Sequence, residues 1–181
     1  MATVAMSPGP VSGAGWDLDG YLRRPEMVGA RACGEVLDRV QAGEPLDREP
    51  LVADLAASLV SGLLGAAVPA EVASAAVTIT RPGASGIPWS RPASGPGGVH
   101  ALAVVALARA TLATGCPVVV PGSHRDAAHD PPALPVVGAV PVPLERGDVL
   151  VVDGRLLHRR TDNHSIDTTA ALVVAFRRPG G

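Results

Sequence analysis

The chain has 181 residues, 47% of them hydrophobic, and a formal net charge of -2, so a single domain with a sizeable core is expected. All 15 basic residues are arginines, and the lack of lysine excludes Schiff-base chemistry. Only 2% of the residues are aromatic, and with no basic face expected this argues against nucleic-acid binding. No apolar run has the length of a membrane span, so no membrane partner is expected.

Residues 1–15 are small and rich in proline and glycine, without the basic start and apolar stretch of a signal peptide. We expect them to form a flexible tail before one domain at residues 16–181. Cys33 and Cys116 lie far apart and neither belongs to a C-x-x-C motif. They are therefore expected to be buried as small hydrophobic residues in a reduced, cytoplasmic protein.

The first third of the chain shows helical patterns. Residues 16–21 (WDLDGY) have the composition of a turn that leads into a helix. Apolar residues recur at helical spacing over residues 26–41, between Pro25 and Gly43, which predicts a first helix. Leucines recur every four residues within residues 49–64, and Gly65 follows them. This spacing predicts a second helix.

From Ala73 onward the pattern changes to β-branched alternation, and the rest of the chain is expected to form short strands. Long proline-rich loops are predicted at residues 83–98 and 126–135. The predicted strands are residues 73–81, 99–107, 117–120, 136–142, 148–152, 156–158 and 169–176. Helices followed by many strands indicate an α+β chain whose β part closes as a barrel or sandwich.

Two segments have a familiar order and spacing: VVVPGSHR at residues 118–125, and GDVLVVDGRLLHRRTDN at residues 147–163. With the apolar strand that follows and the DLDGYL segment near the amino terminus, they resemble the phytanoyl-CoA dioxygenase family. The resemblance implies a double-stranded β-helix, a jelly roll of the cupin type, with flanking amino-terminal helices. It also implies an oxygenase that uses iron(II) and 2-oxoglutarate.

In that family, iron is bound by a His-x-Asp pair before the PGSHR segment and by a distal histidine after it. An arginine roughly ten residues beyond the distal histidine binds the carboxylate of the cosubstrate. Here His158 falls on the distal histidine, and Asn163 on an asparagine that usually follows it. Ser90 and Pro92 stand in place of the His-x-Asp pair, and residues 167–169 contain no arginine.

Three of the four functional positions are thus lost together, whereas halogenases of this fold lose only the carboxylate. One imidazole cannot hold iron, because such sites need a ligand set of fixed geometry. We therefore expect no metal and no cofactor.

His158 is the first candidate catalytic residue, because an imidazole inside a cavity can act as a general acid or base. It could equally be a residue retained in the wall of the pocket. Asp153, five residues earlier, is the second candidate: it could orient the imidazole, but capping the intervening turn is the better-supported role.

Five further residues are candidates for substrate binding. Trp89 could be a platform for an apolar ligand or a plug in the core. Ser90 and Arg91 could donate hydrogen bonds to a carbonyl or carboxylate, although Arg91 could also face solvent. His124 and Arg125 could contact the substrate or hold their own loop by structural hydrogen bonds.

The favoured hypothesis is a metal-independent enzyme on this fold that cyclises or isomerises a small biosynthetic intermediate. A non-catalytic binding or accessory protein is the first alternative. An oxygenase whose ligands have moved, for example to His124 or Asp153, is the second. The expected partner is a small-molecule substrate, and a homodimer is left open.

Overall fold

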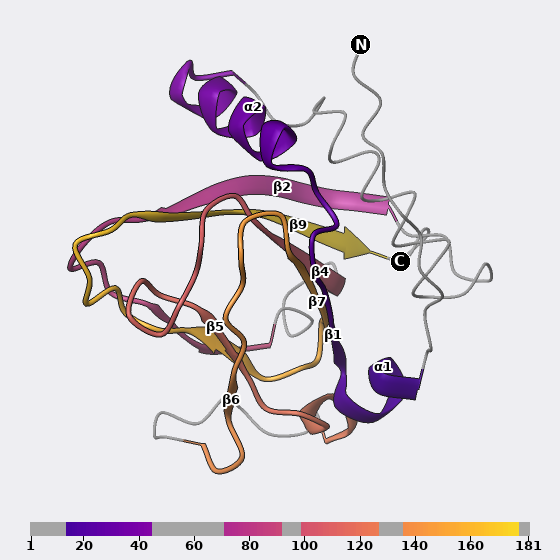
Figure 1. Cartoon of the computed structure of the whole chain (residues 1–181). Helices are drawn as coiled ribbons and strands as arrows, with labels where there is room; N and C mark the ends of the chain where they lie inside the picture. The colour runs from indigo at the N-terminus through magenta and orange to yellow at the C-terminus, as the bar shows by residue number, and fades with distance from the viewer. Residues whose placement is uncertain (1–13, 45–70, 92–98, 127–135, 178–181) are drawn as a thin grey trace.

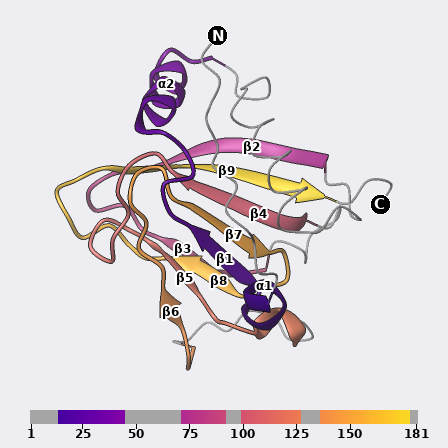
Figure 2. The same ribbon diagram turned by 45° about the vertical axis from the view of Figure 1, so that its right-hand side comes forward.

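Two antiparallel sheets form the body of the protein, as a computed structural model covering residues 14–44, 71–91, 99–126 and 136–177 describes it (Figure 1). The larger sheet has the order β1 (Tyr21–Arg24), β7 (Val149–Asp153), β4 (Val99–Ala106), β9 (Thr169–Arg177), β2 (Glu71–Thr80). The smaller sheet has the order β3 (Ile87–Ser90), β8 (His158–Arg160), β5 (Pro117–Val119), β6 (Val140–Pro141). From β2 onward the chain crosses repeatedly between the sheets, which lie face to face in Figure 2. The predicted double-stranded β-helix is confirmed.

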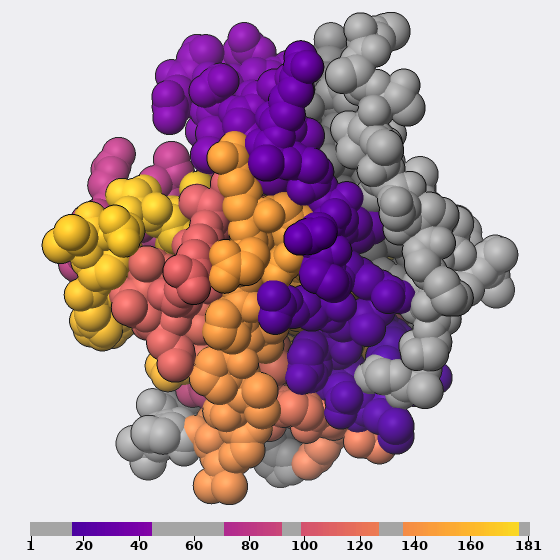
Figure 3. All heavy atoms as spheres, in the orientation of Figure 1, coloured from indigo at the N-terminus to yellow at the C-terminus, as the bar shows by residue number. Residues whose placement is uncertain are grey.

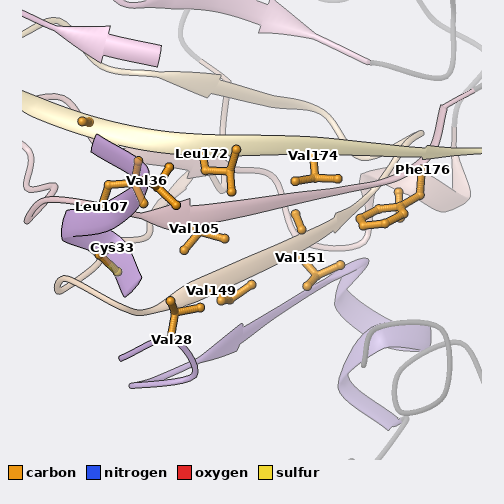
Figure 4. Close-up of a cluster of buried hydrophobic side chains, with 13 residues drawn as sticks. Val28, Cys33, Val36, Val105, Leu107, Val149, Val151, Leu172, Val174 and Phe176 are labelled. Atoms are coloured by element: carbon orange, nitrogen blue, oxygen red, sulfur yellow. The ribbon is translucent and has the colours of Figure 1, made fainter. Parts of the chain in front are cut away.

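The larger sheet is apolar on both faces because its strands alternate two sets of small hydrophobic side chains. Two clusters of buried residues cover its two faces: an outer cluster on the side of Cys33 and Val36, and an inner cluster on the side of the smaller sheet. In β4, Ala101, Ala103 and Val105 belong to the outer cluster, whereas Leu102 and Val104 pack against the inner one. Helix α2 (Ala30–Gln41) covers the outer face with Cys33 and Val36, as the close-up in Figure 4 shows. All five residues of β7 are buried. The two free cysteines are buried, as the sequence predicts.

Helix α2 confirms the first predicted helix but begins at Ala30, later than expected. Its amino-terminal neighbours form a turn in which Glu26 has a φ of 52° and the Val28 N–H donates to the Gly147 carbonyl at 2.9 Å. Gly147 has a φ of 92°, and a Cβ there would overlap the Val28 carbonyl oxygen. Only glycine therefore fits at position 147, where the turn before β7 packs against the turn before α2.

The expectation for residues 16–21 is wrong in its order of elements. A short helix, α1 (Ala14–Asp19), comes first, and strand β1 follows it. β1 pairs antiparallel with β7, so this segment extends the larger sheet, and Figure 3 shows it lying against the β7 side of the molecule. Its pattern is that of an edge strand, whose alternation is too short to identify from sequence.

Most predicted strands are confirmed, with three corrections. β3 lies inside the segment expected to be a loop at residues 83–98. The strand expected at residues 136–142 is reduced to Val140–Pro141, and the strand expected at residues 156–158 begins only at His158. The predicted helix at 49–64, residues 1–13 of the expected tail, Pro92 and most of the 126–135 loop lie outside the described residues. Within the described part of the chain, no helix has the length and apolar character needed to cross a membrane.

The carboxylate of Asp148 joins three segments at one end of the larger sheet. Its Oδ2 accepts a 2.6 Å bond from Nη2 of Arg23 in β1 and a 3.0 Å bond from the Glu145 N–H. Its Oδ1 accepts a 3.0 Å bond from the Glu26 N–H. Burial alone would raise the pKa of Asp148, but the bonds from Glu26, Arg23 and Glu145 outweigh it and lower the pKa below its usual value.

We expect Asp148→Asn to lower the free energy of unfolding by about 1–3 kcal/mol at neutral pH, because an amide oxygen replaces a charged acceptor of several bonds. A carboxyl group with a lowered folded-state pKa contributes stability above its unfolded-state pKa of about 3.9, and loses it as the pH falls through the folded value. The stability gap between the two proteins should therefore narrow below about pH 4. Urea unfolding across this pH range measures it.

Glu35→Gln is the matched control, since Glu35 makes an exposed pair with Arg31 on α2. It should change stability by less than about 0.5 kcal/mol. A gap for Asp148→Asn that stays constant into acid would contradict the role of the charge.

Candidate functional site

A cavity of about 260 Å³ lies between the two sheets. Its apolar wall consists of inward side chains of β4 and β9, where Ala106 and Ala171 leave room that larger residues would fill. β2 contributes Thr78 and Thr80 to the same wall. The volume is near the lower end of the range for small-molecule sites, about 300 Å³ upward. The fold therefore encloses a mostly apolar space with few polar groups.

The polar groups of the cavity come mainly from the paired strands β3 and β8. Ser90 is directly opposite His158 in the strand register, and both residues line the cavity. Arg160, two residues after His158, lines it as well. Since side chains two residues apart share a face of a strand, the imidazole and the guanidinium belong to one wall.

The ring of His158 has a defined tautomer when it is neutral. Its Nδ1 lies 3.1 Å from the carbonyl oxygen of Leu156, and a carbonyl can only accept, so Nδ1 carries the hydrogen. Nε2 is then the basic nitrogen. Burial lowers the pKa of His158, and the bond to Leu156 offsets this only in part. The imidazole is therefore neutral at pH 7 and able to take a proton.

Asp153 caps the turn between β7 and β8. Its Oδ1 accepts a 2.8 Å bond from the Arg155 N–H and a 3.1 Å bond from the Arg155 Nε. Burial acts to raise the pKa of Asp153, but the bonds from Arg155 prevail and lower it. No hydrogen bond joins Asp153 to His158 in the part of the chain that the structure describes. Of the two interpretations from sequence, the turn role is the one that these contacts match.

The PGSHR segment holds the amino-terminal helix. His124 Nε2 lies 3.3 Å from the Asp17 carbonyl oxygen, and Arg125 Nη2 donates to the Leu18 carbonyl at 2.8 Å. The imidazole of His124 packs on Gly20, where any Cβ would overlap the ring. Neither His124 nor Arg125 is among the residues lining the cavity. The structural interpretation fits both.

Arg91 likewise fastens loops together. Its Nη1 donates to the carbonyls of Ser123, at 2.8 Å, and Arg155, and its Nη2 lies 3.3 Å from the Asp126 carbonyl. Trp89 lies under the guanidinium of Arg159, 5.3 Å from the ring centroid. Neither Trp89 nor Arg91 lines the cavity, so only Ser90 of this trio does.

Asn163 is also a structural residue. Its amide nitrogen donates to the carbonyls of Thr80 at 3.1 Å and Asp167 at 2.7 Å, and its Oδ1 accepts from the Ser165 N–H at 2.9 Å. These bonds tie the loop between β8 and β9 to the end of β2. Full satisfaction of a buried amide explains why this position needs an asparagine.

Sequence reasoning missed Arg160. The signal was available in the two-residue period from His158, because a strand that turns His158 inward turns Arg160 inward too. The prediction ended that strand at His158, whereas β8 begins there.

The described residues do not fit the iron ligand set of the family. His158 is the only histidine, cysteine, aspartate or glutamate among the residues lining the cavity, counted over the described part of the chain. No group of three such side chains is close enough to hold a metal ion anywhere in that part. Near the position of the family's arginine, Thr169 lines the cavity instead. Pro92 lies outside the described residues.

Comparison with known proteins identifies related folds and one related family. The phytanoyl-CoA dioxygenase (PhyH) family model matches residues 81–169. Dioxygenase cdmD of Talaromyces verruculosus is 40% identical over 63 residues, which are 34% of this chain and 20% of that protein. The matched segment thus spans a fifth of the length of that relative.

Solved structures agree over most of the chain. The non-heme alpha ketoglutarate dependent epimerase SnoN from nogalamycin biosynthesis has a TM-score of 0.76 at 22% identity, covering 91% of this chain and 79% of its own. The carbocyclase SnoK from the same biosynthesis has a TM-score of 0.73 at 19% identity, covering 93% and 87%. EctD from S. alaskensis has a TM-score of 0.74 at 19% identity, covering 98% and 84%. At these identities the likeness establishes the fold.

The strand order of the two sheets, the family match across β3 to β8 and these structural neighbours lead to one assignment. Residues 81–169 match the phytanoyl-CoA dioxygenase family, and the described chain has the fold of these neighbours.

Proposed function

We propose that this chain is a metal-independent enzyme that isomerises or cyclises a small biosynthetic intermediate in the cavity between its sheets. The observation that carries the proposal is the polar content of that cavity. It has one neutral imidazole, His158, opposite a serine hydroxyl, Ser90, in walls that are otherwise mainly apolar. Such a site can bind and orient an apolar molecule and move one proton.

The ligand positions of the family support a reaction without iron. Ser90 faces His158 across the strands where the family's first histidine would stand, and a neutral hydroxyl is a poor ligand for iron(II). The two relocated ligands considered from sequence, His124 and Asp153, are absent from the cavity lining. His124 contacts α1, and Asp153 is paired with Arg155.

Proton transfer by His158 is a balanced route to an isomer. Nε2 would take a proton from one carbon of the substrate, and the resulting imidazolium would return it to another carbon or to an oxygen. No electrons are gained or lost, so the step needs no oxidant. The lowered pKa of His158 suits the first half of this cycle, because the base is already unprotonated at pH 7.

The named relatives offer an analogy at the level of fold. An epimerase and a carbocyclase, both alpha ketoglutarate dependent, share this architecture and act in one biosynthesis. Rearrangement of a biosynthetic intermediate is thus a reaction class that the fold accommodates, although fold alone does not assign chemistry.

We expect the purified protein, loaded with iron(II) and desalted, to retain fewer than about 0.1 iron per chain, and to leave 2-oxoglutarate unchanged. The matched positive control is Ser90→His/Pro92→Asp, which restores the family's pair opposite His158. It should retain about one iron per chain. Elemental analysis and succinate release measure both. One iron per wild-type chain, or turnover of 2-oxoglutarate, would establish the oxygenase alternative instead.

The imidazole of His158 should titrate below the ordinary value of about 6.5, because its cavity is apolar. Carbon-detected or proton NMR of the ring signals follows the titration, and His158→Asn assigns the signal. A His158 midpoint at or above the ordinary value of about 6.5 would contradict the role of a neutral base.

For any substrate that the wild-type protein converts, His158→Gln should lower kcat by about 100-fold or more if the imidazole transfers the proton. The cavity should still bind the substrate, so KM changes little. His124→Gln is the control, because it makes the same substitution at a histidine that does not line the cavity, and it should leave kcat nearly unchanged. The Tm of both variants is recorded. A loss of only a few-fold with an unchanged Tm would contradict proton transfer by His158 and favour catalysis by shape and hydrogen bonding.

A further inference from the structure

Strand β8 separates its cationic side chains onto two faces. Arg159 is exposed and its guanidinium lies over the ring of Trp89, although the residue also borders the cavity. His158 and Arg160 are the alternate residues and both line the cavity. In the register, Arg160 is paired with Ile87 on one side and with Pro117 on the other, neither of which can neutralise a charge. The guanidinium therefore enters an apolar setting.

Arg160 lacks a partner among the described residues. Its Nε is buried and makes no hydrogen bond. Only four buried side-chain nitrogens in the described part of the chain are in this condition, and Arg160 is the only one of their residues that lines the cavity. Arginines elsewhere in the same fold are paired: Arg23 with Asp148, and Arg155 with Asp153.

A partly buried guanidinium without a partner is energetically unfavourable, because the buried part of the group loses water without gaining a counter-charge. Burial accordingly lowers the pKa of Arg160. Arginine still remains protonated at physiological pH, so the charge persists. A carboxylate matches the planar guanidinium through two parallel hydrogen bonds and would supply what the protein does not.

The remaining walls describe the rest of the ligand. Leu102, Val104 and Val173 face the cavity with small alanines between them, and the further polar groups include the hydroxyls of Thr78, Thr80 and Ser90. Two residues along a strand span about 6–7 Å, which is the separation expected between His158 and Arg160 at the backbone. A molecule held at its anionic end would thus present a neighbouring carbon to the imidazole.

We propose that Arg160 binds the carboxylate of an otherwise apolar small molecule in this cavity. The inference rests on the proposed function and names the substrate class for the same site. It differs from cosubstrate binding in the family, whose arginine lies roughly ten residues beyond the distal histidine rather than two. A polar dicarboxylate such as 2-oxoglutarate would leave its second charge against apolar walls.

The test measures binding of 2-naphthoate and of its neutral isostere 2-naphthamide to the full-length protein by calorimetry. Naphthoate should bind at least about 10-fold more tightly than naphthamide. Arg160→Gln should abolish that preference, while Arg160→Lys should retain part of it. Arg159→Gln is the matched control, because it removes the same charge from the adjacent residue, whose guanidinium is exposed and lies over the ring of Trp89. It should preserve the preference.

Three results would overturn the inference: equal binding of the two probes, no binding of either, or a preference that survives in Arg160→Gln. Tighter binding of 2-oxoglutarate than of naphthoate, lost in Arg160→Gln, would also overturn it and make Arg160 a cosubstrate residue. The Tm of each variant establishes that it is folded. His158→Gln should still bind naphthoate, so a failure of the proposed proton transfer is distinguishable from a failure of the anion site.

Discussion

Burial of both faces of the five-stranded sheet is the constraint on which the rest of this structure depends. Strand β7 has no exposed residue, so one face must be covered by α2 and the other by the smaller sheet. The chain meets this requirement almost without aromatic residues, using valine, leucine and alanine. Small side chains pack the outer face closely against α2 but leave the inner face incompletely filled. The cavity is thus a consequence of how this sheet is covered.

The strands of the larger sheet could be predicted because their two-residue alternation is a property of the local sequence. β2, β4, β7 and β9 all lie close to their predicted positions. The smaller sheet was harder to predict, since its strands are two to four residues long and are defined by their partners. β3 is a strand because Ile87 and Ser90 pair with β8, and nothing in a glycine- and proline-rich segment reveals that pairing.

The candidate site likewise contains residues that could be predicted from sequence and residues whose roles could not. His158, the residue that the motif singled out, lines the cavity, and the strand register pairs it with Ser90. His124 and Arg91 have partners that sequence could not reveal, because those partners lie in α1 or in turns far away along the chain. Asp153 differs, since its partner Arg155 is two residues away in the same turn. Whether a polar residue is free for chemistry depends on which groups already satisfy it, and that is a tertiary property.

Around the cavity, the polar side chains therefore fall into two groups. Asp148 and Asp153 are buried and accept bonds from backbone and arginine donors, and buried Asn163 donates to two backbone carbonyls, so the three residues fix the turns beside the strands. His158 and Arg160 have unused polar atoms on one wall of a space with little other polarity. In the proposed reaction, a neutral base beside a cation suits the removal of a proton from carbon, because the cation stabilises the negative charge left on the substrate. The low polarity of the walls strengthens the attraction between that charge and the guanidinium.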